Sequence, residues 1–533
     1  MLGRIFDQPI HYEDLVRKID RLSKICAGDS NEVYLSKSDK EIQLLTSVLS
    51  RHPDPKLLFE NSRILITCAM RTLVKYSVYK FGVRFEVGIS GHKRHTKYVQ
   101  AKENFNNLVN ILSSFTPDRM IEMIVTIIHR DNIWVFRRVS LDILLVMLGA
   151  GLNGFLICNK IVDKVEFPET DQEGDSKSVV KVLYELLNHY RWPENDDTTT
   201  FLERLLNLYY KSLHNSQDTS RDLSDLRGSL ELCVRHIIHN VTDKHLLIII
   251  KLMSAWSIID PVDHNIVQKY GGTLEYAAYV HKGDTFARTL TTDIVLLLMK
   301  MIGSEVKFVS LLGNRVLQYL IDRGGNQMFF NTPKIFFPEI RLNVKLCDYN
   351  REDKSFQYNR EDKHFLKSHR EVVHKNMIKS ILNHCHTRLN LETTYCTICL
   401  LLVEIPCGFS AAMLSCLMMH LQEIVRKHQD QIGRKESYHI HALIISVLSF
   451  VCWIHEARDF HAYVINTAME RAQWAPHLNP PLQSSYNFAV HHVHWDKPEL
   501  YFDNWEVRLG LWRRFRLNQE IKMKSKRVVL IQD

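Results

Sequence analysis

Glycine and proline are scarce in this sequence, at 20 and 14 of 533 residues. A chain of this length built from strands needs many tight turns, and those turns draw on both residue types. Apolar residues make up 45% of the chain and charged residues 24%, which excludes wholesale disorder. The composition therefore favours a helical protein, large enough for about two to four domains or for one elongated array of repeats.

The 11 cysteines show no paired spacing, and an odd number does not suit the disulfide framework of a secreted protein. The N-terminal residues, MLGRIFDQPIHYEDLVRK, lack the basic start, apolar core and small-residue cleavage site of a signal peptide. Both observations predict a reducing compartment, and we expect a cytoplasmic or nuclear protein.

Most signatures of catalysis are absent as well. There is no G-x-x-x-x-G-K-[ST] loop to cradle phosphates, and no G-x-G-x-x-G, G-x-S-x-G or H-E-x-x-H motif. His129-Arg130-Asp131 has the letters of a kinase catalytic loop, but Phe136 stands where the metal-binding asparagine belongs. We therefore expect no catalytic residue and no cofactor, and we interpret the chain as a non-enzymatic protein.

Cys396 and Cys399 form a C-x-x-C pair, with Cys385 and His386 upstream. Zinc sites of this kind usually combine two such pairs on loops, whereas this pair lies in an apolar helical run and no second pair exists. Cysteine is also a common core residue. The spacing therefore favours buried core positions over a metal site.

Histidines gather around the helical run ALIISVLSFVCWIHEARDF. They are His439, His441, His455 and His461. His455 and Asp459 stand one helical turn apart, so they are expected to share a face. We interpret these histidines as polar residues at helix ends and expect no metal site; a divergent metalloenzyme built on this cluster is the less favoured alternative.

Apolar residues recur at i, i+3, i+4 and i+7 in one segment after another, the pattern of a helix with a buried face. The pattern occurs over Lys40–His52, Arg119–Arg130, Thr199–Leu213, Asp225–Val241, Thr242–Ile259 and Ser410–His428. Thr116-Pro117-Asp118 predicts a helix start with proline at the first helical position. Period-two alternation is rare, and the best example, Lys334–Leu346, is interrupted by Pro338.

Several helical runs are apolar on more than one face, as in Trp134–Ile157, so they need neighbours on both sides. Stacked helical layers provide such neighbours, and candidate helix pairs follow one another at intervals of about 30–50 residues. In this the sequence resembles the armadillo/HEAT class of helical repeats. The resemblance implies an all-α, α-solenoid-like stack of antiparallel helices that serves as a scaffold or adaptor for other proteins. An irregular large helical domain is the alternative.

One segment, Thr393–Met419, is apolar enough to raise the question of a membrane span. Glu404 is its only charged residue, but Pro406 and Gly408 split the segment into two parts that are each too short to cross a bilayer. We interpret it as a buried helical hairpin and expect no membrane span.

Two interruptions are predicted as surface loops. Val165–Ser178 is rich in acidic residues, and Gly324–Phe365 contains the hexapeptide YNREDK twice, at Tyr349–Lys354 and Tyr358–Lys363. We interpret the duplication as an insertion tolerated by a loop, with a ligand site as the alternative. The domains predicted are a helical array over residues 1–324, an irregular loop over 325–365, a second array over 366–475 and a tail over 476–533.

The tail carries most of the net charge. The net charge of the chain is +8, and residues 508–527 alone contribute +7, because they contain eight Lys and Arg residues and a single acidic residue, Glu520. Prolines end the helical array before it, and the segment His491–Arg516 then combines aromatic residues with arginines. We expect an irregular aromatic and basic element that folds back on the last helices.

Three roles are open for this tail. It can cap the helical stack, since a terminal repeat needs a polar outer face. It can dock on an acidic protein surface, since Trp and Arg are enriched at binding hot spots. It can contact nucleic acid, with Gly91–Lys97 as a second basic contact. His491, His492 and His494 have no neighbouring cysteine or carboxylate, so a metal site there is not favoured. The predicted partner-binding residues are Trp505, Arg508, Trp512, Arg513, Arg514, Arg516, Lys522, Lys524, Lys526 and Arg527.

Overall fold

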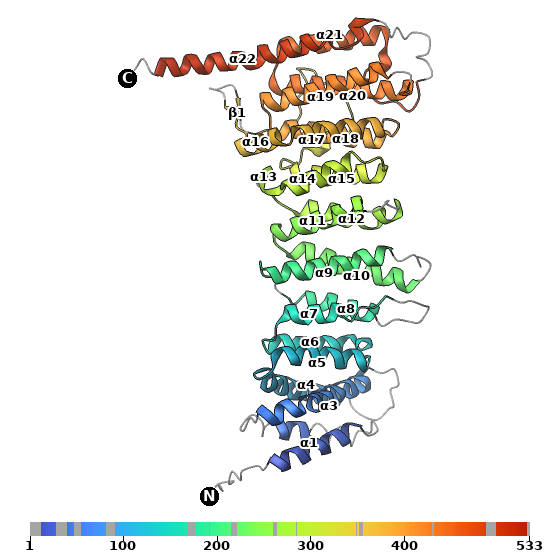
Figure 1. The fold of residues 1–533 in the computed structure, drawn as a ribbon, viewed down its shortest axis with the longest axis vertical. Helices are drawn as coiled ribbons and strands as arrows, with labels where there is room; N and C mark the ends of the chain where they lie inside the picture. The colour runs from blue at the N-terminus through green and yellow to red at the C-terminus, as the bar shows by residue number, and fades with distance from the viewer. Residues whose placement is uncertain are drawn as a thin grey trace. The chain divides into compact units, whose positions relative to one another are not determined.

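The computed structural model describes residues 12–27, 40–46, 55–81, 91–167, 176–190, 192–214, 221–259, 264–283, 285–347, 349–350, 355–428, 431–486 and 497–529. The regular secondary structure of these residues is helical, apart from one pair of two-residue strands (Figure 1). The prediction of an all-α, solenoid-like stack is confirmed, but the basic C-terminal residues expected to be irregular form a helix, α22, over Asn504–Val529. The contacts divide the chain into two compact units, Met1–Val241 and Thr242–Asp533. The domain boundaries expected near residues 325, 366 and 476 stay a prediction.

In the first unit, helices pack mainly on the second helix along the chain, and several also pack on the next one. Contacts join α3 to α4, α4 to α6, α5 to α7, α6 to α8, α7 to α9 and α8 to α10. This is why runs such as Trp134–Ile157 are apolar on more than one face. Residues 40–46 are also helical. The bounds are α1 Tyr12–Ala27, α3 Pro55–Phe81, α4 Gly91–Ser113, α5 Pro117–Arg130, η1 Ile133–Val135, α6 Arg137–Gly149, α7 Gly154–Val162, α8 Ser176–Leu187, α9 Asp196–His214 and α10 Arg221–Asn240.

The second unit repeats this arrangement in successive layers (Figure 1). Helix α11 contacts α12 and α14, α15 contacts α12, α14 and α18, and α20 contacts α18, α19 and α21. The bounds are α11 Asp243–Ile259, α12 His264–Val280, α13 Phe286–Thr289, α14 Thr292–Ile302, α15 Lys307–Ile321, η2 Gln327–Phe329, β1 Tyr349–Asn350, β2 Ser355–Phe356, α16 Arg360–Ser368, α17 Arg370–Asn383, α18 Arg388–Glu404, α19 Gly408–Lys427, α20 Arg434–His455, α21 Arg458–Trp474, η3 Pro476–Leu478, η4 Pro498–Leu500 and α22 Asn504–Val529.

Local chemistry explains where several helices begin and end. Helix α5 begins at Pro117, as the Thr-Pro-Asp sequence predicts. The apolar run Trp134–Ile157 breaks between α6 and α7, because Gly151 adopts a φ of 76° and the Asn153 side chain caps α7. The run is therefore three short elements, η1, α6 and α7, and not one helix.

The apolar segment Thr393–Met419 forms the expected helical hairpin of α18 and α19. By length and composition alone, α19 and α20 are each long and apolar enough to cross a membrane. The apolar window of α20 is 94% buried inside the protein, and that of α19 is 56% buried. The burial of α20 is typical of the core helix of a folded domain, and such helices meet the same criteria of length and composition as a membrane span.

The prediction of a tolerant surface loop over Gly324–Phe365 is wrong for the second YNREDK copy. There Asn359 caps α16, and Asp362 is fully buried, accepting hydrogen bonds from Phe286 N at 2.7 Å and from Arg323 Nη1 at 2.9 Å. Insertion-tolerant positions do not carry buried, paired carboxylates. In the first copy Tyr349–Asn350 pairs with Ser355–Phe356 as β1 and β2, while residues 351–354 lie outside the described part. Of the acidic loop predicted over residues 165–178, residues 168–175 lie outside it too.

Candidate protein-docking surface

The C-terminal turns are held to the helices by one buried arginine, Arg471 of α21. Its guanidinium is completely buried, donating hydrogen bonds to the carbonyl oxygens of Leu500 at 2.7 Å, Leu478 at 3.1 Å and His441 at 3.2 Å. It also lies 5.2 Å from the centre of the Phe502 ring. Among the described residues no carboxylate pairs with it, and burial lowers the pKa of Arg471 to about 10. At neutral pH it is a buried cation whose Nε and Nη1 donate to backbone carbonyls, while Nη2 is buried without a hydrogen-bond partner among the described residues.

The aromatic residues before α22 fold back on the last helices. Gln422 of α19 pairs with the backbone of Phe502 twice, donating to its carbonyl at 2.8 Å and accepting from its N–H at 3.0 Å. The ring of Tyr501 lies under the guanidinium of Arg426, 4.6 Å from the ring centre. This segment therefore covers apolar surface at the end of the second unit.

One face of α22 packs against the helices below it. Asp503 caps the helix by accepting from the N–H groups of Trp505 and Glu506 at 2.7 and 3.2 Å. A Cβ atom on Gly510 would lie 2.7 Å from the Cβ of Phe460, so only glycine allows this close approach to α21. The buried positions of this face are Val507, Gly510 and Leu511.

The opposite face of α22 exposes tryptophan and arginine. Trp505 is 69% exposed and Trp512 is 53% exposed, with exposed Arg508 and Arg516 between and beyond them. Their spacing of i, i+3, i+7 and i+11 places all four on one side of the helix. The Arg516 guanidinium lies 4.5 Å from the Trp512 ring centre. We call these four residues the Trp–Arg face.

The other arginines predicted to bind a partner have contacts within the chain. Arg514 is half-buried and donates from Nε to the carbonyl of His455, which ties α22 to the end of α20. Arg513 forms a long ion pair of 3.8 Å with Asp459 across exposed surface. Arg514 therefore holds the helix in place, whereas Arg513 stays available at the surface.

Several residues predicted to bind a partner have side chains outside the described part of the chain. Helix α22 includes Lys522, Lys524, Lys526 and Arg527, but the side chains of residues 517–529 are outside the described part. The same holds for residues 491–496 and for the side chains of residues 91–94 at the start of α4. Predictions that rest on these residues stay predictions.

A cleft of about 980 Å³ lies beside the Trp–Arg face, between α19 and α22. Its lining includes the cations Arg426, Lys427 and Arg508 and the apolar residues Met419 and Leu511. Lys427 is already paired with Glu423 at 2.6 Å on the surface of α19. The cleft therefore combines apolar walls with an excess of positive charge.

The predicted shared face of His455 and Asp459 is wrong. Helix α20 ends at His455, Glu456 adopts a φ of 49°, and Asp459 belongs to the next helix. His461 donates from Nε2 to the carbonyl of Phe336 at 2.7 Å. Across the part of the chain that is described, no three His, Cys, Asp or Glu side chains converge on a metal position.

Cys396 and Cys399 are buried in α18. Burial raises the pKa of Cys396 to about 12 and that of Cys399 well above its ordinary value. Both thiols therefore occupy buried core positions, as the sequence predicts.

Buried histidines make the second unit sensitive to acid. Burial lowers the pKa of His455 to about 3, that of His477 to about 4, and that of His441 well below 6.5. Below pH 6.5 the unfolded chain binds protons that the folded chain does not, so the stability present above pH 6.5 is lost as the pH falls towards these lowered values. We expect the free energy of unfolding to fall by about 1.4 kcal/mol per pH unit for each such histidine.

Urea unfolding between pH 7.5 and 4.5 measures this slope. Replacing His455 by asparagine should reduce this slope by about one proton per molecule. Leu232→Asn, at an exposed position without a titratable group, should leave the slope unchanged. A free energy of unfolding that stays constant across this range would contradict the prediction.

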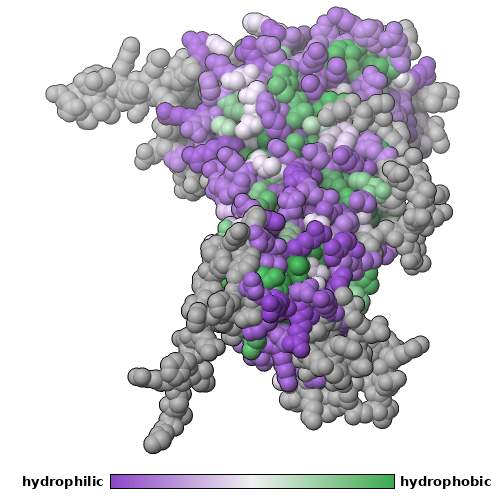
Figure 2. All heavy atoms as spheres, turned by 60° about the horizontal axis from the view of Figure 1, so that its bottom comes forward, coloured by the Kyte–Doolittle hydropathy of each residue, from purple (hydrophilic) through white to green (hydrophobic). Residues whose placement is uncertain are grey.

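Among the described residues outside α22, exposed apolar side chains are spread over many helices, and the most exposed of them, Tyr279 and Met328, line one cleft. The face drawn in Figure 2 is mainly hydrophilic, with hydrophobic residues in small separate groups. Scattered single apolar residues are normal on a protein surface, whereas two tryptophans on one helix face are not. The Trp–Arg face is therefore the strongest candidate for a docking surface.

Comparison with known families bears out the architecture. A family model described as EFR3, armadillo repeat, matches residues 82–507. No curated protein and no solved structure matches the chain. The resemblance to armadillo repeats is thus confirmed over well more than half of the sequence, with residues of both units included. The chain belongs to the EFR3 armadillo-repeat family.

Proposed function

We propose that this protein is a non-enzymatic helical scaffold that holds a partner protein against the Trp–Arg face of α22. Family membership supports a scaffold or adaptor. The observation that carries the choice of surface is the exposure of Trp505 and Trp512 on one side of a helix whose other side is packed. A folded chain gains nothing from leaving two tryptophans in water unless a partner covers them.

The chemistry of this surface specifies the partner. Tryptophan and arginine dominate binding hot spots, because both bury large area and arginine also forms charge-assisted hydrogen bonds. Arg508 and Arg516 lie on the face, and Arg426 lies in the neighbouring cleft. A partner with apolar pockets and an acidic rim fits this combination. Nucleic acid is the alternative, with the bases stacking on the tryptophans.

The test begins with a photo-crosslinking amino acid in place of Arg513, an exposed residue next to Trp512, in the full chain, which identifies what covers the face in cells. The identified partner is then purified, and its affinity is measured for the unaltered chain and for Trp505→Ala/Trp512→Ala. We expect the double variant to bind at least about a hundredfold more weakly, since loss of each hot-spot residue costs about 2 kcal/mol or more.

Tyr279→Ala is the matched control, because Tyr279 is 67% exposed on α12 and far from α22 in sequence. It should bind like the unaltered chain, and all variants should melt at the same temperature, since none of the replaced side chains is buried. Equal binding by the double variant would overturn the proposal. Crosslinks to nucleic acid that disappear with nuclease, and binding that falls steeply with salt, would establish the alternative.

A variant that replaces Arg513, Arg514 and Arg516 together would be unsuitable for testing this docking surface. Replacing Arg514 breaks its hydrogen bond to the carbonyl of His455 and weakens the packing of α22 on the end of α20. Any loss of binding would then mix a folding defect with a docking defect.

A further inference from the structure

Residues Ile340–Leu346 form an extended segment in the second unit. The backbone shows no turn or bend here, and side chains alternate between exposed Arg341, Asn343 and Lys345 and half-buried Leu342, Val344 and Leu346. This is the period-two pattern that the sequence shows over Lys334–Leu346, and it is typical of a strand with one covered face. Yet no strand of the described chain pairs with it.

The ends of the segment are fixed by side chains. The side chain of Asn326 bonds to both backbone groups of Lys345, as a neighbouring strand would. Its Oδ1 accepts from the N–H at 2.8 Å, and its Nδ2 donates to the carbonyl at 3.0 Å. At the other end Trp453 Nε1 donates to the carbonyl of Ile340 at 3.1 Å. The segment is therefore held straight from both ends.

Between these anchors the backbone is unpaired. The N–H and carbonyl groups of Arg341, Leu342, Asn343 and Val344 enter no hydrogen bond with the described residues. Backbone groups at successive residues of a strand point to opposite edges. The backbone N–H and carbonyl groups of Leu342 and Val344 therefore point to the same edge as those of Ile340, the edge that faces Trp453. The backbone groups of Asn343 point to the opposite edge, together with those of Lys345.

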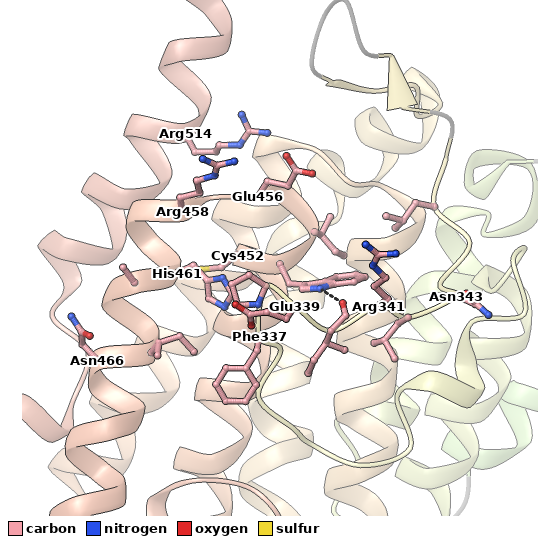
Figure 3. Close-up of a pocket in the computed structure, with 18 residues that line it drawn as sticks. Phe337, Glu339, Arg341, Asn343, Cys452, Glu456, Arg458, His461, Asn466 and Arg514 are labelled. Carbon is pink, nitrogen blue, oxygen red and sulfur yellow. Dashed lines mark hydrogen bonds between the residues drawn. The ribbon is translucent and has the colours of Figure 1, made fainter.

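A cleft of about 1270 Å³ lies along the first of these edges, between the segment and helices α20 and α21 (Figure 3). Its apolar lining includes Phe337, Trp453 and Ile465. This volume exceeds the roughly 300–1,000 Å³ of sites for small ligands. A peptide fills it better than a metabolite does.

Positive charge is in excess around the cleft. Arg458 and Arg514 reach it from α21 and α22, and Arg341 stands on the segment itself (Figure 3), against the carboxylates Glu339 and Glu456. The side chains of Arg341 and Arg458 form no hydrogen bond or ion pair with the described residues. Two arginines are thus available to an acidic ligand.

We propose that this cleft binds an extended acidic segment of a partner protein, which adds as a strand to Ile340–Leu346. The strand supplies the backbone hydrogen bonds that Leu342 and Val344 lack, places alternate apolar side chains on the cleft floor, and offers carboxylates to Arg341 and Arg458. A helix cannot do this, because its backbone groups are already paired internally. The proposal goes beyond the Trp–Arg face and does not depend on it.

The first experiment uses random linear peptides of about seven residues, a typical strand length, displayed on phage. They are selected in parallel on the unaltered full chain and on Arg341→Glu/Arg458→Glu. The unaltered chain should enrich acidic peptides with alternating apolar residues, and the charge variant should not. Selection of the same peptides by both chains would overturn the proposal, and so would the absence of any enriched acidic peptide.

The second experiment tests the strand pairing with one selected peptide, labelled for fluorescence anisotropy. A fully N-methylated copy of this peptide, which cannot donate backbone hydrogen bonds, should bind at least about tenfold more weakly to the unaltered chain. Equal binding of the two peptides would contradict strand addition.

Two proline variants test the edge. Leu342 lines the cleft, and Leu342→Pro removes an N–H from the edge that it shares with Ile340, so it should weaken binding at least about tenfold. Asn343→Pro removes an N–H from the opposite edge and should not weaken binding. Equal weakening by both would contradict the assigned edge. If Leu342→Pro also lowers the melting temperature, the comparison of the two peptides on the unaltered chain decides the question.

Discussion

Replacement of Arg323 by methionine is expected to lower the free energy of unfolding by about 3–5 kcal/mol. Arg323 pairs with Glu404 at 2.7 Å and with Asp362 at 2.9 Å, and the two carboxylates are 5% and 0% exposed. Its guanidinium also lies 4.8 Å from the centre of the Phe286 ring. Methionine fills similar space but leaves two buried carboxylates without their cation, which is the costly way to break a buried ion pair.

The loss should depend on pH. Burial already raises the pKa of Glu404, and the hydrogen bond from Arg323 opposes that rise. Without Arg323 the folded chain holds a proton on Glu404 that the unfolded chain releases above about pH 4.5. The difference between variant and unaltered chain should therefore be larger at pH 7.5 than at pH 5.

Urea unfolding at the two pH values measures this difference. Arg315→Met is the matched control, because Arg315 pairs with Glu275 at 3.3 Å but is 41% exposed. Loss of such a surface pair should cost less than about 1 kcal/mol. Similar losses for the two variants would contradict the prediction.

Replacement of Arg471 by methionine is expected to cost about 2–4 kcal/mol and to loosen the C-terminal turns. Each buried carbonyl that loses its charged donor costs about 1–3 kcal/mol, and part of the sum returns because a buried cation is removed. The carbonyls of Leu478 and Leu500 belong to η3 and η4, so these turns should detach from α21 before the helices unfold.

Limited proteolysis with mass spectrometry locates this effect, and thermal melting measures its size. Cleavage should increase near residues 476–503 in Arg471→Met. Arg458→Met on the same helix is the control, since the Arg458 side chain is exposed and forms no contact of this kind with the described residues. Unchanged cleavage in Arg471→Met would show that the turns do not depend on this arginine.

Helix positions were largely predictable, because their signals lie within a few residues of each other. Pro117 after a threonine marks the start of α5, and the periodic run over Thr242–Ile259 is a single helix, α11, over Asp243–Ile259. The break between α6 and α7 also had a local signal, the glycines and Asn153 that follow Met147, although the apolar run around it predicted one helix. The alternation over Lys334–Leu346 was visible in the sequence, but it is interrupted by Pro338, so neither the extended segment Ile340–Leu346 nor its unpaired edge was predicted.

Sequence reasoning missed Arg471 and Asp362, and it did not separate Arg514 from Arg516. Asp362 sits in a duplicated hexapeptide that looks like an insertion, and its burial depends on Arg323, 39 residues earlier. Arg514 bonds to the carbonyl of His455, 59 residues away, while Arg516 lies over Trp512 on the exposed side. Nothing in the neighbouring sequence predicts that Arg514 is bonded within the chain and that Arg516 is exposed.

The sequence by itself determined that this protein is an all-α stack whose aromatic and basic end differs from its neutral body. Periodicity and net charge are local or additive properties, so they can be read without knowing which segments touch. Only the tertiary structure decided which tryptophans are exposed, which arginine is buried and where a strand edge lies open. Those outcomes depend on packing between residues tens of positions apart. When such packing buries one face of a helix, it also determines which face is exposed to a partner.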